Sequence, residues 1–242
     1  MENLMELKRI VAEAENIVFF GGAGVSTDSG IPDFRGNGGL YTDEYQREES
    51  PRTILSKAYF RENPSGFYAY YRENMIYPFA QPNDAHFALA ELEKQGRLSA
   101  IVTQNIDGLH QAAGSKNVLE LHGTVHKNYC TRCGKQYDLS YIMDSYGVPH
   151  CKDCGSIVRP NVTLYGESPD NEAFIQAQDA IYNADVLIVG GTSLIVHPAA
   201  SLVGEFCGEH LIIINKTSTP YDAYAEYVIR DSIAEVMMQL ID

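Results

Sequence analysis

The sequence predicts an α/β fold in which a doubly wound parallel sheet is joined to a second, smaller domain. Six short apolar, β-branched runs recur along the chain, and most lack the alternation of polar and apolar residues that a sheet with one wet face requires. Helical patterns lie between several of these runs, which is typical of strands joined by crossover helices. Two long stretches interrupt this order, and one of them holds four of the five cysteines.

The six runs are expected to be strands that are covered on both faces. They are Ile17–Phe20, Ala100–Thr103, Val118–Leu121, Val186–Val189, Leu211–Ile214 and Tyr227–Ile229.

Three helices are predicted from their own patterns. The first occupies the acidic amphipathic stretch 1–16, and the third is Asn171–Asn183 with an apolar stripe along it. The second is capped by Asn83 or Asp84 and stops at Gly96. Its apolar residues are Phe87, Leu89 and Leu92.

Two insertions are expected to form the smaller domain. The first strand and the next are separated by about 80 residues, although a plain βαβ unit takes roughly 30. The excess, residues 37–79, is rich in Tyr, Phe, Arg and Glu and is expected to add helices. The second insertion, residues 125–160, holds the four cysteines. The larger domain is then discontinuous and comprises residues 1–36, 80–124 and 161–242.

The net charge of −14 argues against a nucleic-acid surface, because phosphate contacts need clustered Lys and Arg. It favours a cationic partner such as a lysine-rich segment, although acidity can also serve solubility alone. No apolar run approaches the roughly 20 residues of a membrane span, and residues 1–16 lack the features of a secretory signal. We expect a cytoplasmic protein that binds neither nucleic acid nor membranes, and a monomer.

Residues 21–36, GGAGVSTDSGIPDFRG, follow the first strand where the chain must turn sharply. Three glycines in four positions allow unusual φ angles and let a phosphate approach the backbone. The next amides, of Val25, Ser26 and Thr27, are then expected at a helix N-terminus facing that phosphate. The second half places Phe34 and Arg35 on a loop that resembles a lid or a reaction wall. Taken alone, the strand–glycine–helix pattern also fits an ordinary tight turn.

Four cysteines form two CxxC pairs separated by 17 residues: Cys130, Cys133, Cys151 and Cys154. This spacing is typical of a zinc ribbon, and a glycine follows each pair where a tight knuckle needs one. Disulfides are the alternative, but nothing in the sequence suggests export. Four thiolates leave no open coordination position, so we expect a structural zinc ion and no catalytic one.

The fifth cysteine and several histidines are expected to be structural. His126 and His150 lie near the cysteines, but two complete CxxC pairs make them unnecessary as ligands. His86 and His110 are interpreted as structural histidines. Cys207 is predicted to be a small buried thiol.

Polar residues gather where the second strand ends, since Gln104, Asn105 and Asp107 directly follow it. Ligands bind at the carboxyl ends of strands in open α/β sheets, so these residues are candidates for a site. The alternative is that Asn105 and Asp107 only cap a loop. His122 also sits at a strand end, before a glycine. Because an imidazole titrates near neutral pH, His122 is a candidate general base.

Together these segments resemble the sirtuin family of NAD-dependent protein deacylases, as found in small bacterial members. The motifs, in chain order, are GAGVSTDSGIPDFRG, TQNIDGLH, HG, the cysteine quartet, RPNVTLYGE, GTSLIVHPA and a late Asn215. The resemblance covers nearly the whole chain and accounts for both insertions as one small domain beside a Rossmann-like domain. It implies NAD as co-substrate, one structural zinc ion per chain, and acyl-lysine proteins or peptides as partners.

The resemblance also implies a role for each matching residue. The catalytic residues would be His122, as the base, and Asn105, which would face the nicotinamide ribose. The NAD-binding residues would be His122 itself, Ala23, Gly24, Thr27, Phe34, Arg35, Gln104, Ile106, Asp107, Thr192, Ser193, Asn215 and Ile233. The residues that flank an extended peptide would be Val162, Leu164, Tyr165, Gly166, Glu167, Leu194 and Val196.

The implied reaction transfers the acyl group from lysine to ADP-ribose and releases nicotinamide, while His122 removes a proton from a ribose hydroxyl. Phe34 is expected to keep water from the reacting centre. Two other functions are open: a protein mono-ADP-ribosyltransferase on the same scaffold, and a non-enzymatic NAD-binding or zinc-ribbon module. His122 favours the deacylase, because sugar transfer to a protein nucleophile does not require that base.

The acyl group is expected to be uncharged. Family members that prefer acidic acyl groups carry a Tyr-x-x-Arg pair in the helical insertion. Tyr68 matches the tyrosine, but Tyr71 takes the arginine position and Arg72 comes one residue late, which is about 100° of rotation on a helix. The segment RPNVTLYGE carries Asn161, Thr163 and Tyr165 where the family more often has Asp, Val and Phe, so altered peptide contacts are expected.

Overall fold

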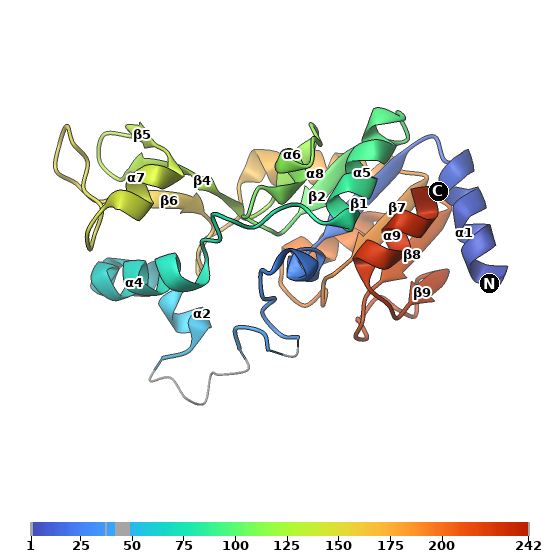
Figure 1. The fold of residues 1–242 in the computed structure, drawn as a ribbon, viewed down its shortest axis with the longest axis horizontal. Coiled ribbons are helices and arrows are strands. Elements are labelled where there is room, and N and C mark those ends of the chain that lie inside the picture. The colour runs from blue at the N-terminus through green and yellow to red at the C-terminus, as the bar shows by residue number, and fades with distance from the viewer. Residues whose placement is uncertain (1, 37, 42–48, 242) are drawn as a thin grey trace.

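The larger part of the molecule is built on a six-stranded parallel sheet (Figure 1). The computed structural model describes residues 2–36, 38–41 and 49–241. Each predicted strand is present, and the spatial order β3-β2-β1-β7-β8-β9 confirms the doubly wound arrangement. The order reverses between β1 and β7, which is where an open α/β sheet binds its ligand. The strands are β1 (Ile17–Gly21), β2 (Leu98–Thr103), β3 (Val118–Glu120), β7 (Val186–Gly190), β8 (His210–Ile214) and β9 (Tyr227–Ile229).

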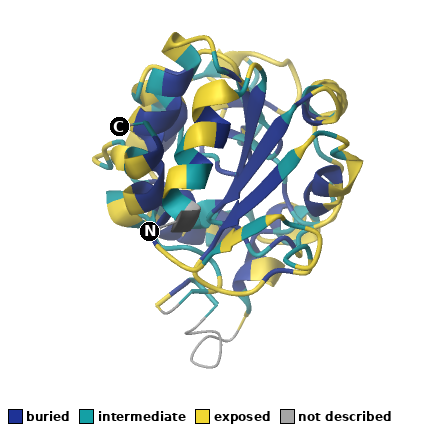
Figure 2. Cartoon of the chain, turned by 90° about the vertical axis from the view of Figure 1, so that its right-hand side faces the viewer, coloured by how far each residue is buried: buried dark blue, intermediate teal, exposed yellow. Residues whose placement is uncertain are grey.

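Helices cover both faces of this sheet, which explains why its strands lack polar alternation. The helices α1 (Glu2–Glu13), α5 (Asp84–Lys94) and α9 (Ile233–Ile241) pack on one face. The helix α8 (Asn171–Tyr182) and the 3-10 helix η4 (Ala199–Glu205) pack on the other. Every residue of β1 and β7 is buried, and Figure 2 shows dark blue strands beside helices with yellow outer surfaces.

The three predicted helices are present. Asn83 caps α5 by accepting a hydrogen bond from the Ala85 amide. Phe87, one of the three apolar residues named for this helix, is 50% exposed. It lies two residues before the fully buried Leu89, about 200° away around the helix. The buried stripe of α5 consists of Ala85, His86, Ala88, Leu89 and Leu92.

The described residues of the smaller part form a three-stranded antiparallel sheet and four helices, at the end of the molecule away from the chain termini (Figure 1). The strands β4 (Gly123–Cys130), β5 (Gln136–Tyr137) and β6 (Val158–Val162) carry the cysteine region together with α7 (Leu139–Asp144). The helical insertion supplies α2 (Pro51–Ile54), α3 (Lys57–Glu62) and α4 (Pro64–Asn74). Its residues 37 and 42–48 lie outside the described residues. The two regions share one core, so the small domain is present as predicted, although its exact boundaries stay predictions.

The two histidines interpreted as structural are buried against each other, with ring centroids 4.7 Å apart. His86 Nδ1 accepts a hydrogen bond from the Asn83 amide at 3.2 Å, and His110 lies on the short helix α6 (Leu109–Ala112). Burial lowers the pKa of His86 to about 4 and that of His110 to about 3, so both are neutral at pH 7. The prediction for Cys207 is wrong: its side chain is exposed, because it lies in the surface turn between η4 and β8.

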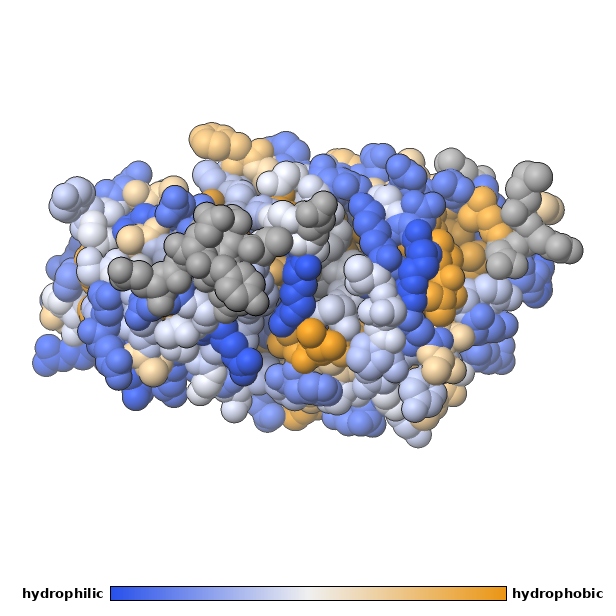
Figure 3. Space-filling view, turned by 90° about the horizontal axis from the view of Figure 1, so that it is seen from below, coloured by the Kyte–Doolittle hydropathy of each residue, from blue (hydrophilic) through white to orange (hydrophobic). Residues whose placement is uncertain are grey.

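The surface is largely hydrophilic on the side that Figure 3 shows from below, where hydrophobic residues form small separate patches. Among the residues that the structure describes, no helix is both long and apolar enough to cross a bilayer.

Candidate active site

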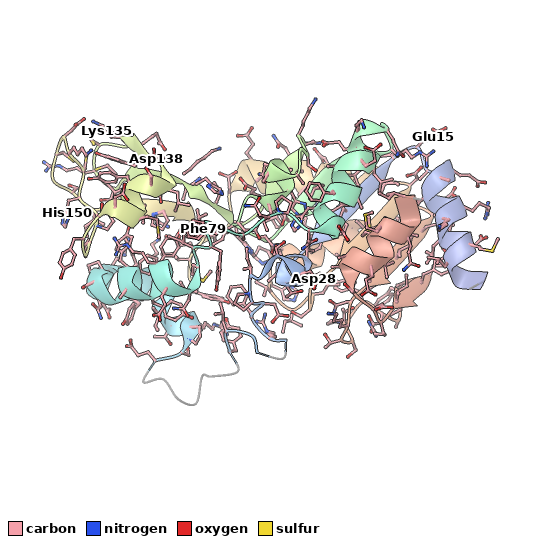
Figure 4. All side chains as sticks on the ribbon, in the orientation of Figure 1. Glu15, Asp28, Phe79, Lys135, Asp138 and His150 are labelled. Atoms are coloured by element: carbon pink, nitrogen blue, oxygen red, sulfur yellow. The ribbon has the colours of Figure 1, made fainter. Side chains whose placement is uncertain are left out.

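A cavity of about 950 Å³ lies at the carboxyl ends of the sheet strands, where the larger and smaller parts meet. In Figure 4 the labelled Asp28 and Phe79 mark the region of this junction. The cavity wall brings together all the catalytic, NAD-binding and substrate residues predicted from the sequence, with one exception. Leu194 is 2% exposed, and its side chain packs in the core beneath α8.

Glycines let two loops touch at the point where the strand order reverses. Gly24 donates its amide to the Gly191 carbonyl at 2.8 Å, and Gly22 donates to Gly190 at 3.3 Å. A Cβ atom on Gly24 would lie 2.8 Å from the Gly191 Cα atom, so no larger residue fits without moving the backbone. The glycines therefore bring the turns after β1 and β7 together beneath the cavity.

The segment after this turn differs from the prediction. It forms two 3-10 turns, η1 (Ala23–Val25) and η2 (Thr27–Ser29), where an α-helix was expected. The amides of Val25 and Ser26 donate to the Gly22 and Ala23 carbonyls. These two amides are therefore used inside the turn, and the expectation that they face a phosphate is not supported.

A chain of hydrogen bonds holds the polar residues after β2. Asn105 Nδ2 donates to Ser26 Oγ at 3.1 Å, and Ser26 Oγ donates to Asp107 Oδ2 at 2.7 Å. Asp107 Oδ1 also accepts from the Leu109 amide at 2.9 Å. Asp107 therefore holds the first amide of α6, in part as the alternative interpretation held, and also lines the cavity. The amide group of Asn105 is fixed by its nitrogen, which leaves its Oδ1 atom to accept from a ligand.

His122 is placed at the cavity by the end of β3 and is oriented by one hydrogen bond. Its Nδ1 atom lies 3.0 Å from the Gln104 carbonyl oxygen. A carbonyl can only accept, so Nδ1 carries the proton and Nε2 keeps a free lone pair. Burial lowers the pKa of His122 below its ordinary value, and the bond to Gln104 opposes this only in part. The neutral imidazole can therefore take a proton at Nε2 at neutral pH.

The pH dependence of the reaction follows from this lowered pKa. The base form of His122 persists as the pH falls through 6.5 and is lost only below that value, near the pKa in the folded protein. We expect the acid limb of kcat/KM to have its midpoint below pH 6.5. Circular dichroism over the same pH range separates loss of the base from unfolding. A midpoint above pH 6.5 in folded protein contradicts this assignment of the base.

The loop predicted to cover the cofactor is tied to the predicted peptide-binding segment. Phe34 and Tyr41 are in ring contact with centroids 5.8 Å apart, and the Arg35 guanidinium lies 5.2 Å from the Tyr41 ring centroid. The Tyr41 hydroxyl is hydrogen-bonded to the Tyr165 hydroxyl at 2.7 Å. The hydroxyl of Tyr165, where the family more often has Phe, thus joins the two loops.

The residues predicted to bind the adenosine half of NAD lie after β7, after β8 and at the start of α9. Gln104 Nε2 donates to Thr192 Oγ1 at 3.1 Å, which links the ends of β2 and β7. Asn215 Nδ2 donates to the Thr217 carbonyl at 2.9 Å, so its side chain is held in the loop that follows β8. Ile233, the first residue of α9, lines the same end of the cavity.

A largely buried ion pair shapes the predicted peptide-binding segment. The Arg159 guanidinium contacts both carboxylate oxygens of Glu167, at 2.8 and 2.9 Å, and donates to the Val162 carbonyl at 3.0 Å. Glu167 also accepts from the Leu164 amide at 3.1 Å. Each side chain of the pair is 14% exposed. Glu167 therefore fixes the bend of residues 162–167 from within.

Removal of this ion pair is expected to destabilise the segment. Glu167→Gln leaves Arg159 with a largely buried charge and no counter-charge, so we expect the free energy of unfolding to fall by about 2–3 kcal/mol, between the values for exposed and fully buried pairs. Urea denaturation measures this, with Glu172→Gln on the exposed side of α8 as the matched control. A loss no larger than that of the control contradicts the structural role of Glu167.

The tyrosines of α4 do not form a pocket for an acidic acyl group. The Tyr68 hydroxyl donates to the Val158 carbonyl, and burial raises its pKa. Tyr71 is fully buried and is the one of the two that lines the cavity. Arg72 donates to the Ile142 and Gly147 carbonyls, away from the cavity lining. The one arginine of α4 therefore does not line the cavity.

The four cysteines converge in the smaller part as predicted, with all their Sγ atoms within 4.8 Å of one another. Three of the Sγ–Sγ distances are 3.4, 3.6 and 3.6 Å. A disulfide needs about 2.05 Å, whereas tetrahedral Zn–S bonds of about 2.3 Å place sulfur atoms about 3.8 Å apart. The cluster therefore fits one structural zinc ion and is not a pair of disulfides.

The surroundings of the cysteine cluster also fit a metal site. Gly134 and Gly155 have φ angles of 71° and 72°, as the predicted knuckles require. The Tyr137 hydroxyl donates to Cys151 Sγ at 3.2 Å and lowers the pKa of that thiol to about 6. His150, labelled at the outer end of this part in Figure 4, is exposed with Nδ1 at 2.7 Å from the Val148 carbonyl. The described cluster thus contains cysteines alone.

Sequence reasoning missed two residues that organise the site. Ser26 is 1% exposed and joins Asn105 to Asp107, although it lies some 80 positions from both along the chain. Tyr41 connects the loop of Phe34 to Tyr165. The position of Ser26 inside the glycine-rich motif could have indicated that its side chain belongs to the site. No pattern in the sequence indicated Tyr41.

Comparison with known proteins agrees with this geometry. Residues 22–198 match the model of the Sir2 family. The NAD-dependent protein deacetylase of Clostridium acetobutylicum is 53% identical over 242 residues, which cover 100% of this chain and 99% of that protein. The enzyme of the same name from Clostridium perfringens is 52% identical with the same coverage of both chains.

Solved structures are similar over the whole fold. A structure of Sir2 with a p53 peptide and NAD+ has a TM-score of 0.87 and 37% identity, and the match covers 100% of this chain and 97% of that one. A second Sir2 structure, with a deacetylated p53 peptide and 3′-O-acetyl ADP ribose, has a TM-score of 0.90 and 38% identity over 98% of this chain and 97% of that one. The chain belongs to the Sir2 family, the sirtuins that its ordered motifs predicted.

Proposed function

We propose that this protein is an NAD-dependent protein deacetylase, which removes acetyl groups from lysine side chains and consumes NAD. One observation carries the proposal: His122, oriented by the Gln104 carbonyl, lines the same cavity as the glycine turn where the strand order reverses. Transfer of an acyl group to a ribose hydroxyl needs a base that takes the hydroxyl proton, and His122 is placed to act as that base. The name and length of the clostridial relatives support the same activity.

The residues around His122 suit a reaction that must exclude water. NAD would lie across the strand ends, with its pyrophosphate near Ala23, Gly24 and Thr27, and its adenosine half near Asn215 and Ile233. Asn105 Oδ1 would accept a hydrogen bond from the bound ribose. When bound, NAD supplies the activated glycosidic carbon. The protein's part is to hold the ribose and to take its hydroxyl proton at His122 Nε2.

The acyl-lysine would enter from the side of the smaller part. Val162, Leu164 and Phe34 supply apolar walls around its neutral side chain, and the peptide would lie as a strand beside residues 162–167 and Val196. The structures of Sir2 with a p53 peptide support a peptide substrate by their similarity. Because α4 presents no arginine to the cavity, an uncharged acyl group is favoured over a succinyl group.

The deciding experiment combines an acetyl-lysine peptide with NAD and follows the products by mass spectrometry. Formation of O-acetyl-ADP-ribose and free lysine supports the proposal. A gain in mass on a target protein, with no deacetylation, supports a mono-ADP-ribosyltransferase instead. Faster turnover of a succinyl-lysine peptide than of its acetyl counterpart contradicts the expected acyl preference.

Finer expectations accompany the proposal. Four free cysteines so close together favour a reducing compartment such as the cytoplasm, where thiolates stay available for zinc. The charge of −14 disfavours a nucleic-acid partner. The monomeric state stays a prediction.

A further inference from the structure

A second cavity, of about 560 Å³, adjoins the active site on the far side of Tyr165 and Gly166. These two residues and Arg52 line both cavities. The rest of the lining comes from α2, α3 and the turn between them: Thr53, Ser56, Lys57, Ala58 and Arg61. We call this second cavity the cationic groove, because its described lining holds three basic side chains and no acidic one.

The three cations are unusual in a chain with 32 acidic and 18 basic side chains. Within the described part of the chain, Arg52, Lys57 and Arg61 take part in no ion pair. Arg52 stacks over the Tyr165 ring, with its guanidinium carbon 5.4 Å from the ring centroid. Their charges are therefore available to a ligand in the groove.

The groove is joined rigidly to the peptide-binding segment. The Lys57 amide donates to the Tyr165 carbonyl at 2.9 Å, and the Tyr165 amide donates to the Leu55 carbonyl at 3.0 Å. The Lys57 charge also helps to lower the pKa of Glu167, so its field reaches this segment. Glu167 itself is neutralised by Arg159 and does not compete for the groove cations. Ser56 Oγ accepts from the Tyr59 amide, which leaves its hydroxyl proton to donate.

We propose that the cationic groove selects substrates with acidic residues beside the acyl-lysine, an inference that rests on the proposed deacetylase function. An extended chain advances about 3.3 Å per residue, so a carboxylate two or three positions from the lysine reaches the groove from the shared wall. The overall charge of −14 acts against acidic peptides, but it is spread over the surface and screened beyond about 8 Å at physiological salt. Within the groove the electrostatic potential of the three nearby cations dominates. We therefore expect acidic residues beside the acyl-lysine to be preferred over the lysine-rich segment that the net charge favours.

The test compares three acetyl-lysine peptides: one with neutral flanks, one with glutamates two and three residues before the lysine, and one with them after it. We expect one acidic peptide to show a KM about fivefold lower than the neutral peptide at low salt, from two exposed charge contacts, with little change in kcat. The difference should shrink at high salt. Equal KM values for all three peptides overturn the proposal.

Variants assign the effect to the groove. Lys57→Ala with Arg61→Ala should abolish the difference in KM between acidic and neutral peptides. The charge-conserving pair Lys57→Arg and Arg61→Lys should keep it. Lys116→Ala, in the loop before β3 at the opposite end of the sheet strands, is the matched control and should also keep it. A preference that survives in the double alanine variant overturns the proposal, whereas no turnover of any peptide contradicts the deacetylase function itself.

Discussion

The variant His122→Ala is expected to lower kcat for deacetylation by about 10²–10⁴-fold, the usual contribution of a positioned general base. His122 Nε2 is the unpaired nitrogen of a partly buried imidazole whose other nitrogen is held by the Gln104 carbonyl. Its removal takes away the proposed proton acceptor and leaves in place the glycine turn and the residues that we propose hold the adenosine half of NAD. The Kd for NAD, measured by titration, should therefore stay close to the wild-type value.

The control for this prediction is His150→Ala, which removes an exposed histidine from the smaller part. Both variants should retain the wild-type circular dichroism spectrum. Undiminished turnover in His122→Ala excludes His122 as the base. Loss of NAD binding together with turnover assigns it to binding alone.

Removal of zinc is expected to unfold the smaller part and abolish activity. Structural zinc sites contribute about 10–16 kcal/mol of apparent binding free energy, which exceeds the total stability of most domains. Here the cluster joins two segments of the smaller part. Cys130 and Cys133 lie at the end of β4, and Cys151 and Cys154 lie between α7 and β6. Elemental analysis should find one zinc ion per chain. A strong chelator should then expose the core of the smaller part to solvent, as read by tyrosine fluorescence and protease sensitivity.

The matched pair for this prediction is Cys151→Ser and Cys207→Ser. Cys151 belongs to the cluster, and Cys207 is an exposed thiol outside it. Only Cys151→Ser should lose zinc and stability. A chelated protein that stays folded and active contradicts the structural role of zinc.

The sheet could be predicted because its signal is local. A run such as Ile17–Phe20 or Val186–Val189 is apolar on both faces, and this pattern needs only neighbouring residues to be recognised. Burial was harder to predict, because it depends on distant partners. Cys207 was predicted to be buried but lies in an exposed turn, and the apolar Phe87 turns to solvent. The apolar character of a residue does not indicate whether the rest of the fold covers its side of a helix or turn.

The site was predictable wherever its residues sit in compact motifs. Gln104, Asn105 and Asp107 follow one strand, and His122 follows the next, so the rule for open α/β sheets places them together. Their orientation was not predictable. The tautomer of His122 depends on the Gln104 carbonyl, and the position of the Asn105 amide depends on Ser26. Each is a hydrogen bond between residues far apart in the chain.

The sequence by itself determined the sheet, the cysteine quartet and the set of residues at the strand ends, because periodicity and spacing are properties of short segments. Only the tertiary structure decided how these residues act. It joined Tyr41 to Tyr165 and Arg159 to Glu167, it turned Arg72 away from the cavity, and it set the cations of α2 and α3 beside the peptide-binding segment. The physical reason is that a side chain's charge, proton position and exposure are fixed by neighbours that the folded chain brings from elsewhere in the sequence.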